Sequence, residues 1–279
     1  MRPIRIIPKL DIKNGQLIKG INLEGLRILG DPYLFAKEYY ENNADEIFYL
    51  DNVATLYGTN NLCKFVTKTV KNIFIPIMVG GGIRTIEDID MMLQSGADRV
   101  CINSAAINNI KIINNSAKIY GSSTICSLVE CVKIDNKYII SKSNGRDLVS
   151  ISPTTWVKRL ENSGSGEIIF TCVQNEGLKK GFDIKIIEKI SKEVSIPVIA
   201  HGGAGTFKDV YDVIKQTNIS GVSIASLFHY DILPKFKFHK RKIGNYHYLN
   251  QLTKSNLKSI NNLYRLKKYL KSKKINVRL

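Results

Sequence analysis

The chain repeats part of its own sequence at a spacing of 121 residues. The repeated segments are IPIMVGGG at 75–82 with IPVIAHGG at 196–203, and DEIF at 45–48 with GEII at 166–169. Thr85 and Asp88, which follow the first glycine run, return at the same spacing as Thr206 and Asp209. Chance likeness between glycine-rich turns would not keep one spacing over several segments. We therefore interpret the chain as two fused halves of the same design.

Short apolar runs rich in β-branched residues alternate with longer amphipathic stretches over the first 230 residues. Nearly continuous apolar character is typical of parallel strands that are buried on both faces. The predicted strands are 4–10, 46–51, 75–79, 99–102, 123–129, 167–172, 197–200 and 221–225. The predicted helices include 31–42, 85–95, 155–162, 183–193 and 206–216. Several of these helices begin at a Ser, Thr or Asp that can cap a helix.

This alternation predicts a (β/α)8 barrel, with four strands from each half. A doubly wound sheet is the main alternative, but such sheets rarely contain eight evenly spaced units. We expect a single domain over residues 1–279, with a basic loop at 231–255 inserted before the final helix. That helix is predicted from Leu263, Leu266 and Leu270, which recur at helical spacing.

The formal net charge of +17 suggests a nucleic-acid ligand, but the distribution of charge argues against one. Of the 41 basic residues, 14 lie from Asp231 onward, against one of the 24 acidic residues. The rest of the chain is nearly balanced in charge. A solvated basic segment or a docking surface for an acidic partner is the simpler interpretation. We expect no nucleic acid and, because no apolar run reaches about 18 residues, no membrane span.

The cysteines and histidines predict neither disulfides nor a metal site. The five cysteines form no CxxC pair and lie in apolar runs, and the four histidines have no HExxH spacing. The first residues, Met1 to Arg5, contain no signal-peptide core. We therefore expect reduced, buried thiols, a cytoplasmic location and no cofactor.

Two glycine-rich turns predict two phosphate sites at one end of the barrel. Each turn follows a strand and precedes a helix, so its backbone N–H groups and the helix dipole favour an anion. In each half the next strand ends in a small polar pair. The candidates are Gly81, Gly82, Asn103 and Ser104 in the first half, and Gly202, Gly203, Ala225 and Ser226 in the second. Two such sites predict an elongated substrate with a phosphate at each end, and tight turns without a ligand are the alternative.

Three carboxylates are expected at the same end of the barrel. Asp11 ends the first strand, Glu130 ends the strand that opens the second half, and Asp51 ends the second strand. Carboxylates at the carboxyl ends of barrel strands face the active-site end, so Asp11 and Glu130 are a candidate general acid/base pair. Lys19 is a candidate partner for the charge of the substrate. The alternatives are a turn cap for Asp11 and solvated surface positions for Glu130 and Lys19.

The opposite end of the barrel is expected to carry a charged set. Arg5, Glu46, Arg99 and Glu167 stand at the starts of the first, second, fourth and sixth strands. Strand starts face the base of a barrel, where two cations and two anions can form a ring of ion pairs. The alternative is that these residues only complete the core.

Many of these residues lie in segments that resemble one known family, the cyclase subunit of imidazole glycerol phosphate synthase, HisF. The matching segments are RIIP at 5–8, LD at 10–11, KG at 19–20, GDP at 30–32, DE at 45–46, LD at 50–51, VGGGI at 79–83, IN at 102–103, GGAG at 202–205 and NVRL at 276–279. The resemblance covers nearly the whole chain outside about residues 231–255. Taken together, these motifs are specific to the family.

The resemblance implies a (β/α)8 barrel with a two-fold repeat and a lyase/cyclase activity. The implied substrate is a bisphosphorylated aminoimidazole carboxamide ribonucleotide that carries a ribulosyl arm. Ammonia from a HisH-like glutaminase, the second subunit of a heterodimer, passes through the barrel and is incorporated. The substrate splits into imidazole glycerol phosphate and an aminoimidazole carboxamide ribonucleotide, in histidine biosynthesis.

The resemblance also implies roles for individual residues. It makes Asp11 a catalytic acid/base, with Glu130 as the second, and it adds Gly177 to the phosphate-binding set. It makes the charged set at the base a gate for ammonia. It further implies that Asp45 and Asp98 lie on the side that faces the glutaminase.

The chain departs from the family pattern around the active-site end. The family usually has Asp where Glu130 stands and Cys where Lys9 stands. Its loop after the sixth strand usually reads Asp-x-Asp-Gly-Thr, whereas this chain has QNEGL at 174–178, and the loop at 141–146 also differs. These departures suggest a divergent paralogue. They leave two alternatives to the cyclase: a HisF-like ammonia-conduit subunit of a surface-sugar amidation system, and a non-catalytic phosphate-binding barrel.

Overall fold

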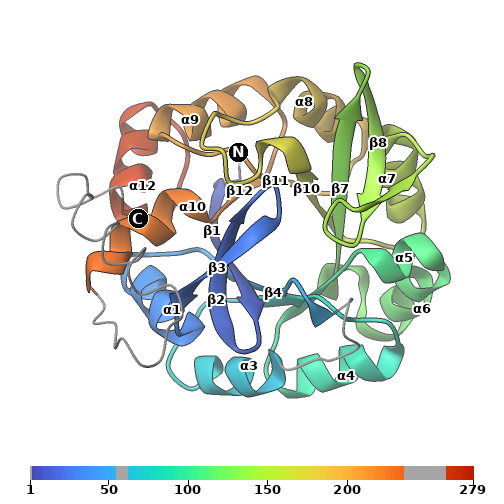
Figure 1. The fold of residues 1–279 in the computed structure, drawn as a ribbon, viewed down its shortest axis with the longest axis horizontal. Helices are drawn as coiled ribbons and strands as arrows, with labels where there is room; N and C mark the ends of the chain where they lie inside the picture. Colours follow the sequence, from blue (N-terminus) through green and yellow to red (C-terminus); the bar gives the residue numbers. More distant parts are fainter. Residues whose placement is uncertain (1, 55–61, 236–261) are drawn as a thin grey trace.

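The predicted strands close into a barrel. The computed structural model describes residues 2–54, 62–235 and 262–279, and within these ranges eight parallel strands pair side by side, with β10 pairing back to β7 (Figure 1). The strands are β1 (Arg5–Lys13), β4 (Ile47–Asp51), β5 (Ile77–Gly80), β6 (Arg99–Ile102), β7 (Ile125–Ile134), β10 (Glu167–Cys172), β11 (Val198–His201) and β12 (Gly221–Ile224). The prediction of a (β/α)8 barrel is confirmed.

Helices surround the barrel in the order that the sequence predicts (Figure 1). The predicted helices are α1 (Pro32–Glu41), α4 (Ile86–Gln94), α7 (Pro153–Asn162), α8 (Ile184–Glu193), α9 (Phe207–Gln216) and the final α12 (Leu263–Ser272). The structure adds α3 (Leu62–Val70), α5 (Ser104–Asn108), α6 (Lys111–Tyr120), α10 (Ser226–Ile232) and the 3-10 turns η1 (Ser122–Thr124), η2 (Val173–Asn175) and η3 (Leu233–Lys235). Most of the predicted basic loop at 231–255 lies outside the described residues. Its first five residues belong to α10 and η3.

Alternate side chains of the strands fill two separate cores. One set faces the interior of the barrel and includes Ile7, Phe48, Met78 and Ile169, all fully buried. Their neighbours in sequence, such as Ile6, pack outward against the helices. This double burial explains why the strands read as almost continuous apolar runs. It also shows that the barrel interior is a packed core at mid-height.

The two halves share local details as well as topology. Thr85 and Asp88 form a capping box at the start of α4, and Thr206 and Asp209 form the same box at the start of α9. Each box satisfies backbone N–H groups that would otherwise lack partners in the first helical turn. The repeat seen in the sequence is therefore a repeat of structure.

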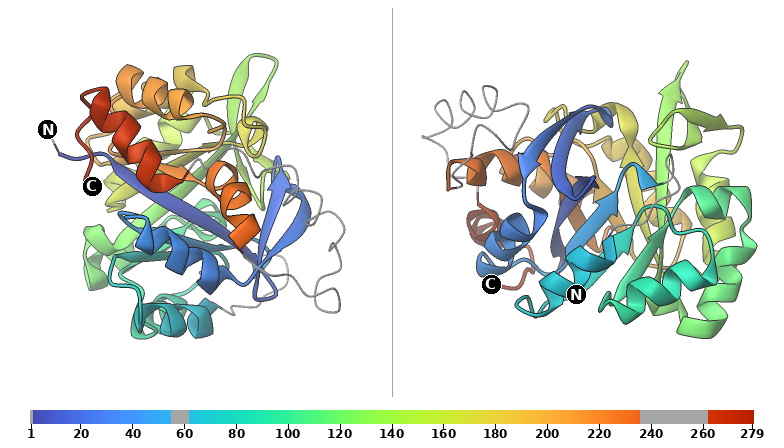
Figure 2. Two further views of the ribbon diagram at one scale, coloured as in Figure 1. Left: turned by 90° about the vertical axis from the view of Figure 1, so that its left-hand side faces the viewer. Right: turned by 60° about the horizontal axis from the view of Figure 1, so that its bottom comes forward.

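Hairpins extend β1 and β7 beyond the barrel (Figure 2). β2 (Gln16–Ile21) and β3 (Glu24–Gly30) follow β1, while β8 (Lys137–Lys142) and β9 (Asp147–Val149) follow β7. β8 begins 121 residues after β2 begins, and it ends 121 residues after β2 ends. The turns at Asn14–Gly15 and at Asp135–Asn136 have positive φ at both positions, as tight two-residue hairpin turns require. The sequence analysis did not predict these hairpins.

Asp45 joins the first strand to the last helix. Its Oδ2 accepts a hydrogen bond of 2.8 Å from the backbone N of Ile6 and lies 2.8 Å from Nζ of Lys267 on α12. Both side chains are buried, and the Lys267 ammonium also donates to the carbonyl of Asn43 at 2.6 Å. The Asp45 side chain is therefore occupied inside the protein. Asp98, in contrast, is exposed and accepts a hydrogen bond from the backbone N of Ile77 at 2.8 Å.

We expect Asp45→Ala to lower the free energy of unfolding by about 3 kcal/mol, because it leaves the Lys267 charge buried without its anion. Asp98→Ala is the matched control, since it removes one exposed acceptor and is expected to cost about 1 kcal/mol. Urea denaturation of both variants measures the difference. Equal losses would show that the Asp45–Lys267 pair is not a main tie between β1 and α12.

Candidate active site

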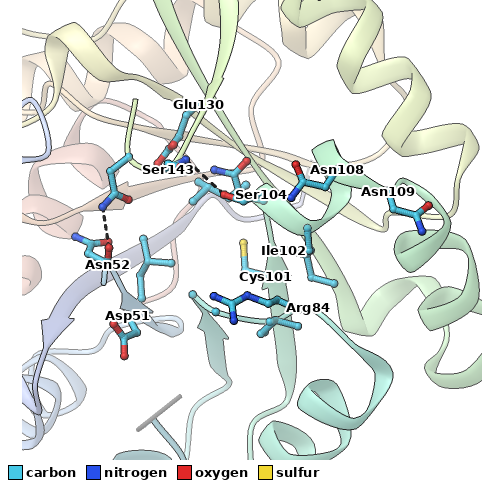
Figure 3. A pocket seen from close by; sticks show the side chains of 18 residues that line it. Asp51, Asn52, Arg84, Cys101, Ile102, Ser104, Asn108, Asn109, Glu130 and Ser143 are labelled. Atoms are coloured by element: carbon cyan, nitrogen blue, oxygen red, sulfur yellow. Dashed lines mark hydrogen bonds between the residues drawn. The ribbon is translucent and has the colours of Figure 1, made fainter. Parts of the chain in front are cut away.

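The first glycine-rich turn lines a pocket at the carboxyl ends of the strands (Figure 3). The pocket has a volume of about 260 Å³. All four candidates of the first phosphate site line it, namely Gly81, Gly82, Asn103 and Ser104. Asp51 and Glu130 line the same pocket, so the structure brings these predicted residues together. Oδ1 of Asp51 is already occupied by the backbone N–H groups of Val53 and Ala54.

The second glycine-rich turn lines a smaller pocket in the other half. Its lining contains every candidate of the second phosphate site, namely Gly177, Gly202, Gly203, Ala225 and Ser226. Glu176, Lys179 and His201 also line it. Asn103 and Ala225, which precede α5 and α10, share nearly the same backbone angles, φ −124° and ψ −88° against φ −118° and ψ −81°. The two pockets are thus built on the same backbone plan.

Close backbone approach explains the glycines in these turns. Gly81 has φ +97°, and a Cβ there would lie 2.2 Å from the carbonyl oxygen of Asp51. Gly203 has φ +114°, and a Cβ there would lie 2.1 Å from the carbonyl oxygen of Gly181. A side chain at either position would therefore both strain and displace the turn.

Each hairpin contacts the phosphate-site loops of the opposite half. In the first hairpin, the backbone N of Asn22 donates to the carbonyl of Glu176 at 2.8 Å. In the second, Nδ2 of Asn144 donates to the carbonyl of Asn52 at 2.7 Å, and the backbone N of Ser143 donates to Oγ of Ser104 at 3.4 Å. The two halves therefore complete each other's sites.

Asp11 is buried between two lysines. Its Oδ1 forms an ion pair with Nζ of Lys9, and its Oδ2 lies 4.0 Å from Nζ of Lys19. Burial raises the pKa of Asp11, but the charges of Lys9 and Lys19 outweigh it and hold the pKa below the ordinary value. Asp11 is thus an ionised carboxylate that faces lysines instead of capping the Asn14–Gly15 turn.

Lys19 is a buried residue, so the solvated alternative does not hold. Its ammonium lies between Asp11 and Glu176 and forms an ion pair with Oε1 of Glu176. Burial raises the pKa of Glu176, but the positive charges of Lys19 and of its other neighbours together outweigh burial. They hold the pKa of Glu176 below its ordinary value. The sequence analysis did not single out Glu176 as a site residue, because its contact with Lys19 joins segments 157 residues apart. Lys9, two residues before Asp11, was noted only as a departure from the family pattern.

Glu130 is a buried carboxyl that forms no ion pair with a described residue. It is 3% exposed, and its Oε2 has no hydrogen-bond partner among the described residues. Burial raises its pKa to about 7, although the charge of Lys9 and hydrogen bonds from Asn103 and the backbone of Gly145 oppose this. At neutral pH Glu130 is therefore protonated in a large share of molecules. A protonated carboxyl beside an ionised one is the arrangement that acid/base catalysis needs.

His201 is a site residue that the sequence analysis missed. It stands where Gly80 stands in the first half, a difference that could have marked it. Its Nδ1 lies 2.9 Å from the carbonyl oxygen of Ser223, so Nδ1 carries the hydrogen. Burial lowers the pKa of His201 to about 4, which leaves Nε2 as a neutral acceptor, 3.8 Å from Oε1 of Glu176.

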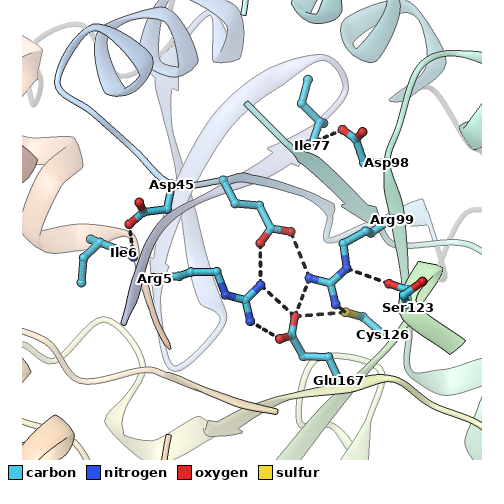
Figure 4. Close-up of polar contacts among 10 residues, drawn as sticks. Arg5, Ile6, Asp45, Ile77, Asp98, Arg99, Ser123, Cys126 and Glu167 are labelled. Carbon is cyan, nitrogen blue, oxygen red and sulfur yellow. Dashed lines mark hydrogen bonds and ion pairs between the residues drawn. The ribbon is translucent and has the colours of Figure 1, made fainter. Parts of the chain in front are cut away.

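The four charged residues at the base form a closed ring of ion pairs (Figure 4). Arg5 Nη1 lies 3.1 Å from Glu46, and Arg99 Nη1 lies 3.3 Å from Glu46 and 2.5 Å from Glu167. Arg5 also pairs with Glu167, so each arginine contacts both glutamates. The glutamate side chains are 2% exposed, against 26% for Arg5 and 15% for Arg99. The ring therefore separates solvent at the base from the apolar interior.

Residues 2–54, 62–235 and 262–279 contain no group of three or more His, Cys, Asp or Glu that could hold a metal ion. Within the same ranges, no helix is both long and apolar enough to span a bilayer. All five cysteines are free thiols, and four of them are buried.

Comparison with known proteins gives one consistent family. A family profile described as "Histidine biosynthesis protein" matches residues 5–234. Three similar relatives are each named imidazole glycerol phosphate synthase subunit HisF. The relative from Legionella pneumophila is 43% identical over 210 residues, which cover 75% of this chain and 99% of the relative. Those from Natranaerobius thermophilus and Bacillus cereus are 40% and 41% identical over 227 residues, or 81% of this chain and 90% of each relative.

We expect the isolated chain to bind a ligand with two phosphates at least about tenfold more tightly than either singly phosphorylated half. The reason is that each pocket offers backbone N–H groups to one phosphate, and a second occupied site adds roughly 1.4 kcal/mol or more. Isothermal titration calorimetry with the three ligands measures the affinities. Equal affinities would show that only one turn holds a phosphate.

Proposed function

Because the chain belongs to the HisF family of imidazole glycerol phosphate synthase subunits, we propose that it catalyses the lyase and cyclase step of histidine biosynthesis. The substrate is the bisphosphorylated aminoimidazole carboxamide ribonucleotide with its ribulosyl arm. Ammonia is incorporated, and the products are imidazole glycerol phosphate and an aminoimidazole carboxamide ribonucleotide.

The observation that carries this proposal is the pair of carboxyl groups with opposite protonation. Asp11 is ionised beside Lys9 and Lys19, and Glu130, whose pKa is raised to about 7, is protonated in a large share of molecules at neutral pH. Asp11 takes up a proton while Glu130 supplies one, which suits a reaction that both breaks a bond and closes a ring. The pockets in the two halves hold the terminal phosphates, so the reacting centre is fixed between them.

An assay without glutaminase tests this proposal directly. The purified chain is mixed with the bisphosphorylated substrate and an ammonium salt, and the two products are separated and quantified. We expect turnover that depends on ammonium concentration. The relatives give the sugar-amidating alternative no support over the histidine-pathway activity. Absence of product at saturating substrate and ammonium would reject the proposed activity.

We also propose that the base of the barrel receives ammonia from a HisH-like glutaminase. The ring of Arg5, Glu46, Arg99 and Glu167 supports this, because four paired charges at the base, two of them buried, serve no chemistry at the opposite end. A ring of paired charges excludes ions from the apolar interior while its contacts can rearrange for a small neutral molecule.

We expect Asp11→Asn to lower ammonium-dependent turnover by about 100- to 10,000-fold, since a positioned acid/base contributes about that much to the rate. Affinity for the bisphosphate should change little because the pockets are intact. Asp98→Asn, at the base, is the matched control and should keep its turnover. If Asp11→Asn retains more than roughly a third of wild-type turnover, Asp11 is not the catalytic group.

We expect Glu167→Ala to impair glutamine-dependent turnover more than turnover supplied with ammonium. The substitution leaves each arginine with one anion, a loss of about 1–3 kcal/mol of pairing in a partly buried ring. Glu188→Ala on α8, which removes an exposed glutamate, is the control. Parallel assays with glutamine plus the glutaminase and with ammonium alone measure the ratio. An equal loss with both nitrogen sources would make Glu167 a structural residue only.

A further inference from the structure

Lys9 is a buried cation in the wall of the barrel. Residues of β1 alternate between the two cores, and Ile7 belongs to the inner one. Lys9 and Asp11 continue this inward face at the next alternate positions. The lysine is 1% exposed, and its Nζ contacts Oδ1 of Asp11, so it reaches the active-site end from within the barrel.

Two buried lysines and two buried carboxylates lie in direct contact at this end of the barrel. Lys9 and Lys19 supply two positive charges, and Asp11 and Glu176 supply two negative ones in direct contact with them. Glu130 and Asp51 are two further buried carboxyls with no ion pair to a described residue, and an unpaired buried carboxylate is costly. Lys9 and Lys19 therefore hold two of these four carboxyls, Asp11 and Glu176, in the ionised form.

The groups that face the two carboxyls come from several elements. Asp11 faces Lys9 on its own strand, Lys19 on β2, Glu176 after β10, and the neutral imidazoles of His201 on β11 and His229 on α10. Glu130 on β7 faces Lys9 and Asp11 on β1, the Asn103 amide after β6 and the backbone N–H of Gly145 in the second hairpin. Lys9 is the cation that acts on both carboxyls, and in both cases its charge lowers the pKa.

We propose that Lys9 is a positioning residue that sets the division of roles, holding Asp11 ionised as the base and leaving Glu130 as the acid. It acts through Asp11, which it contacts, and not on the substrate. Lys19 cannot replace it, because Lys19 is shared with Glu176. This inference rests on the proposed function, since the roles of base and acid belong to that reaction.

The test is the pH dependence of kcat/KM for Lys9→Met, measured with the bisphosphorylated substrate and ammonium. Loss of the cation raises the pKa of both Asp11 and Glu130. Both limbs of the profile should therefore move to higher pH, by about one unit or more for the acidic limb. Lys267→Met, which removes an equally buried lysine from the Asp45 pair, is the matched control and should leave the profile unmoved. A lower rate with an unmoved profile would overturn the proposal, because a merely structural role predicts that result.

A second variant and a second measurement keep the result independent of folding and of turnover. Lys9→Gln keeps a hydrogen-bond donor beside Asp11 without the charge, and it should give the same shift as Lys9→Met. Carboxyl carbon-13 NMR of the free protein, with the Asp11 signal assigned from its loss in Asp11→Asn, follows the titration of Asp11 without any substrate. We expect the Asp11 midpoint to rise by about one unit or more in both Lys9 variants. An unchanged midpoint would reject the role of Lys9 even if the wild-type chain shows no cyclase activity, whereas that lack of activity alone would reject only the proposed function.

Discussion

Ion pairs with arginine or lysine hold most of the buried carboxyl groups at the two ends of this barrel. At the base, Glu46 and Glu167 are both held between two arginines. At the opposite end Asp11 and Glu176 are held by lysines, and Glu130, which forms no ion pair with a described lysine, has a raised pKa. Because the interior between the two ends is apolar, the charged groups at each end must find their partners at that same end. The acid, the base and the closed ring all depend on this pairing.

The strands, most of the helices and both glycine turns could be predicted because their signals are local. Apolar runs buried on two faces, capping residues and glycine positions each show in a few consecutive residues. The hairpin after β1 also had such a signal at Asn14–Gly15, a dipeptide typical of tight hairpin turns. The pair of Lys19 with Glu176 had none, because its members lie 157 residues apart. The burial of Glu130 likewise follows only from the closed barrel and the second hairpin.

Two departures from the family pattern meet in one cluster. Lys9 and Glu176 both differ from the residues usual in the family, and the structure connects them through Asp11 and Lys19. An added cation on β1 is thus accommodated among carboxylates that are already buried. His201, beside Glu176, stays neutral and adds no charge. The two lysines and two carboxylates of the cluster therefore balance in charge, which explains how a lysine is tolerated inside the barrel wall.

Because each hairpin contacts a pocket loop of the opposite half, the two halves depend on each other's structure. Asn22 of the first half holds the loop of the second phosphate pocket, and Ser143 and Asn144 of the second half hold the loops of the first. A half-length fragment would lack a cover for its own pocket and could regain one only from a second copy. Exchange of one half by recombination would likewise place unmatched contacts at both pockets. The outer helices of the two halves can therefore change in sequence independently. Residues at the contacts between a hairpin and the opposite half must change together.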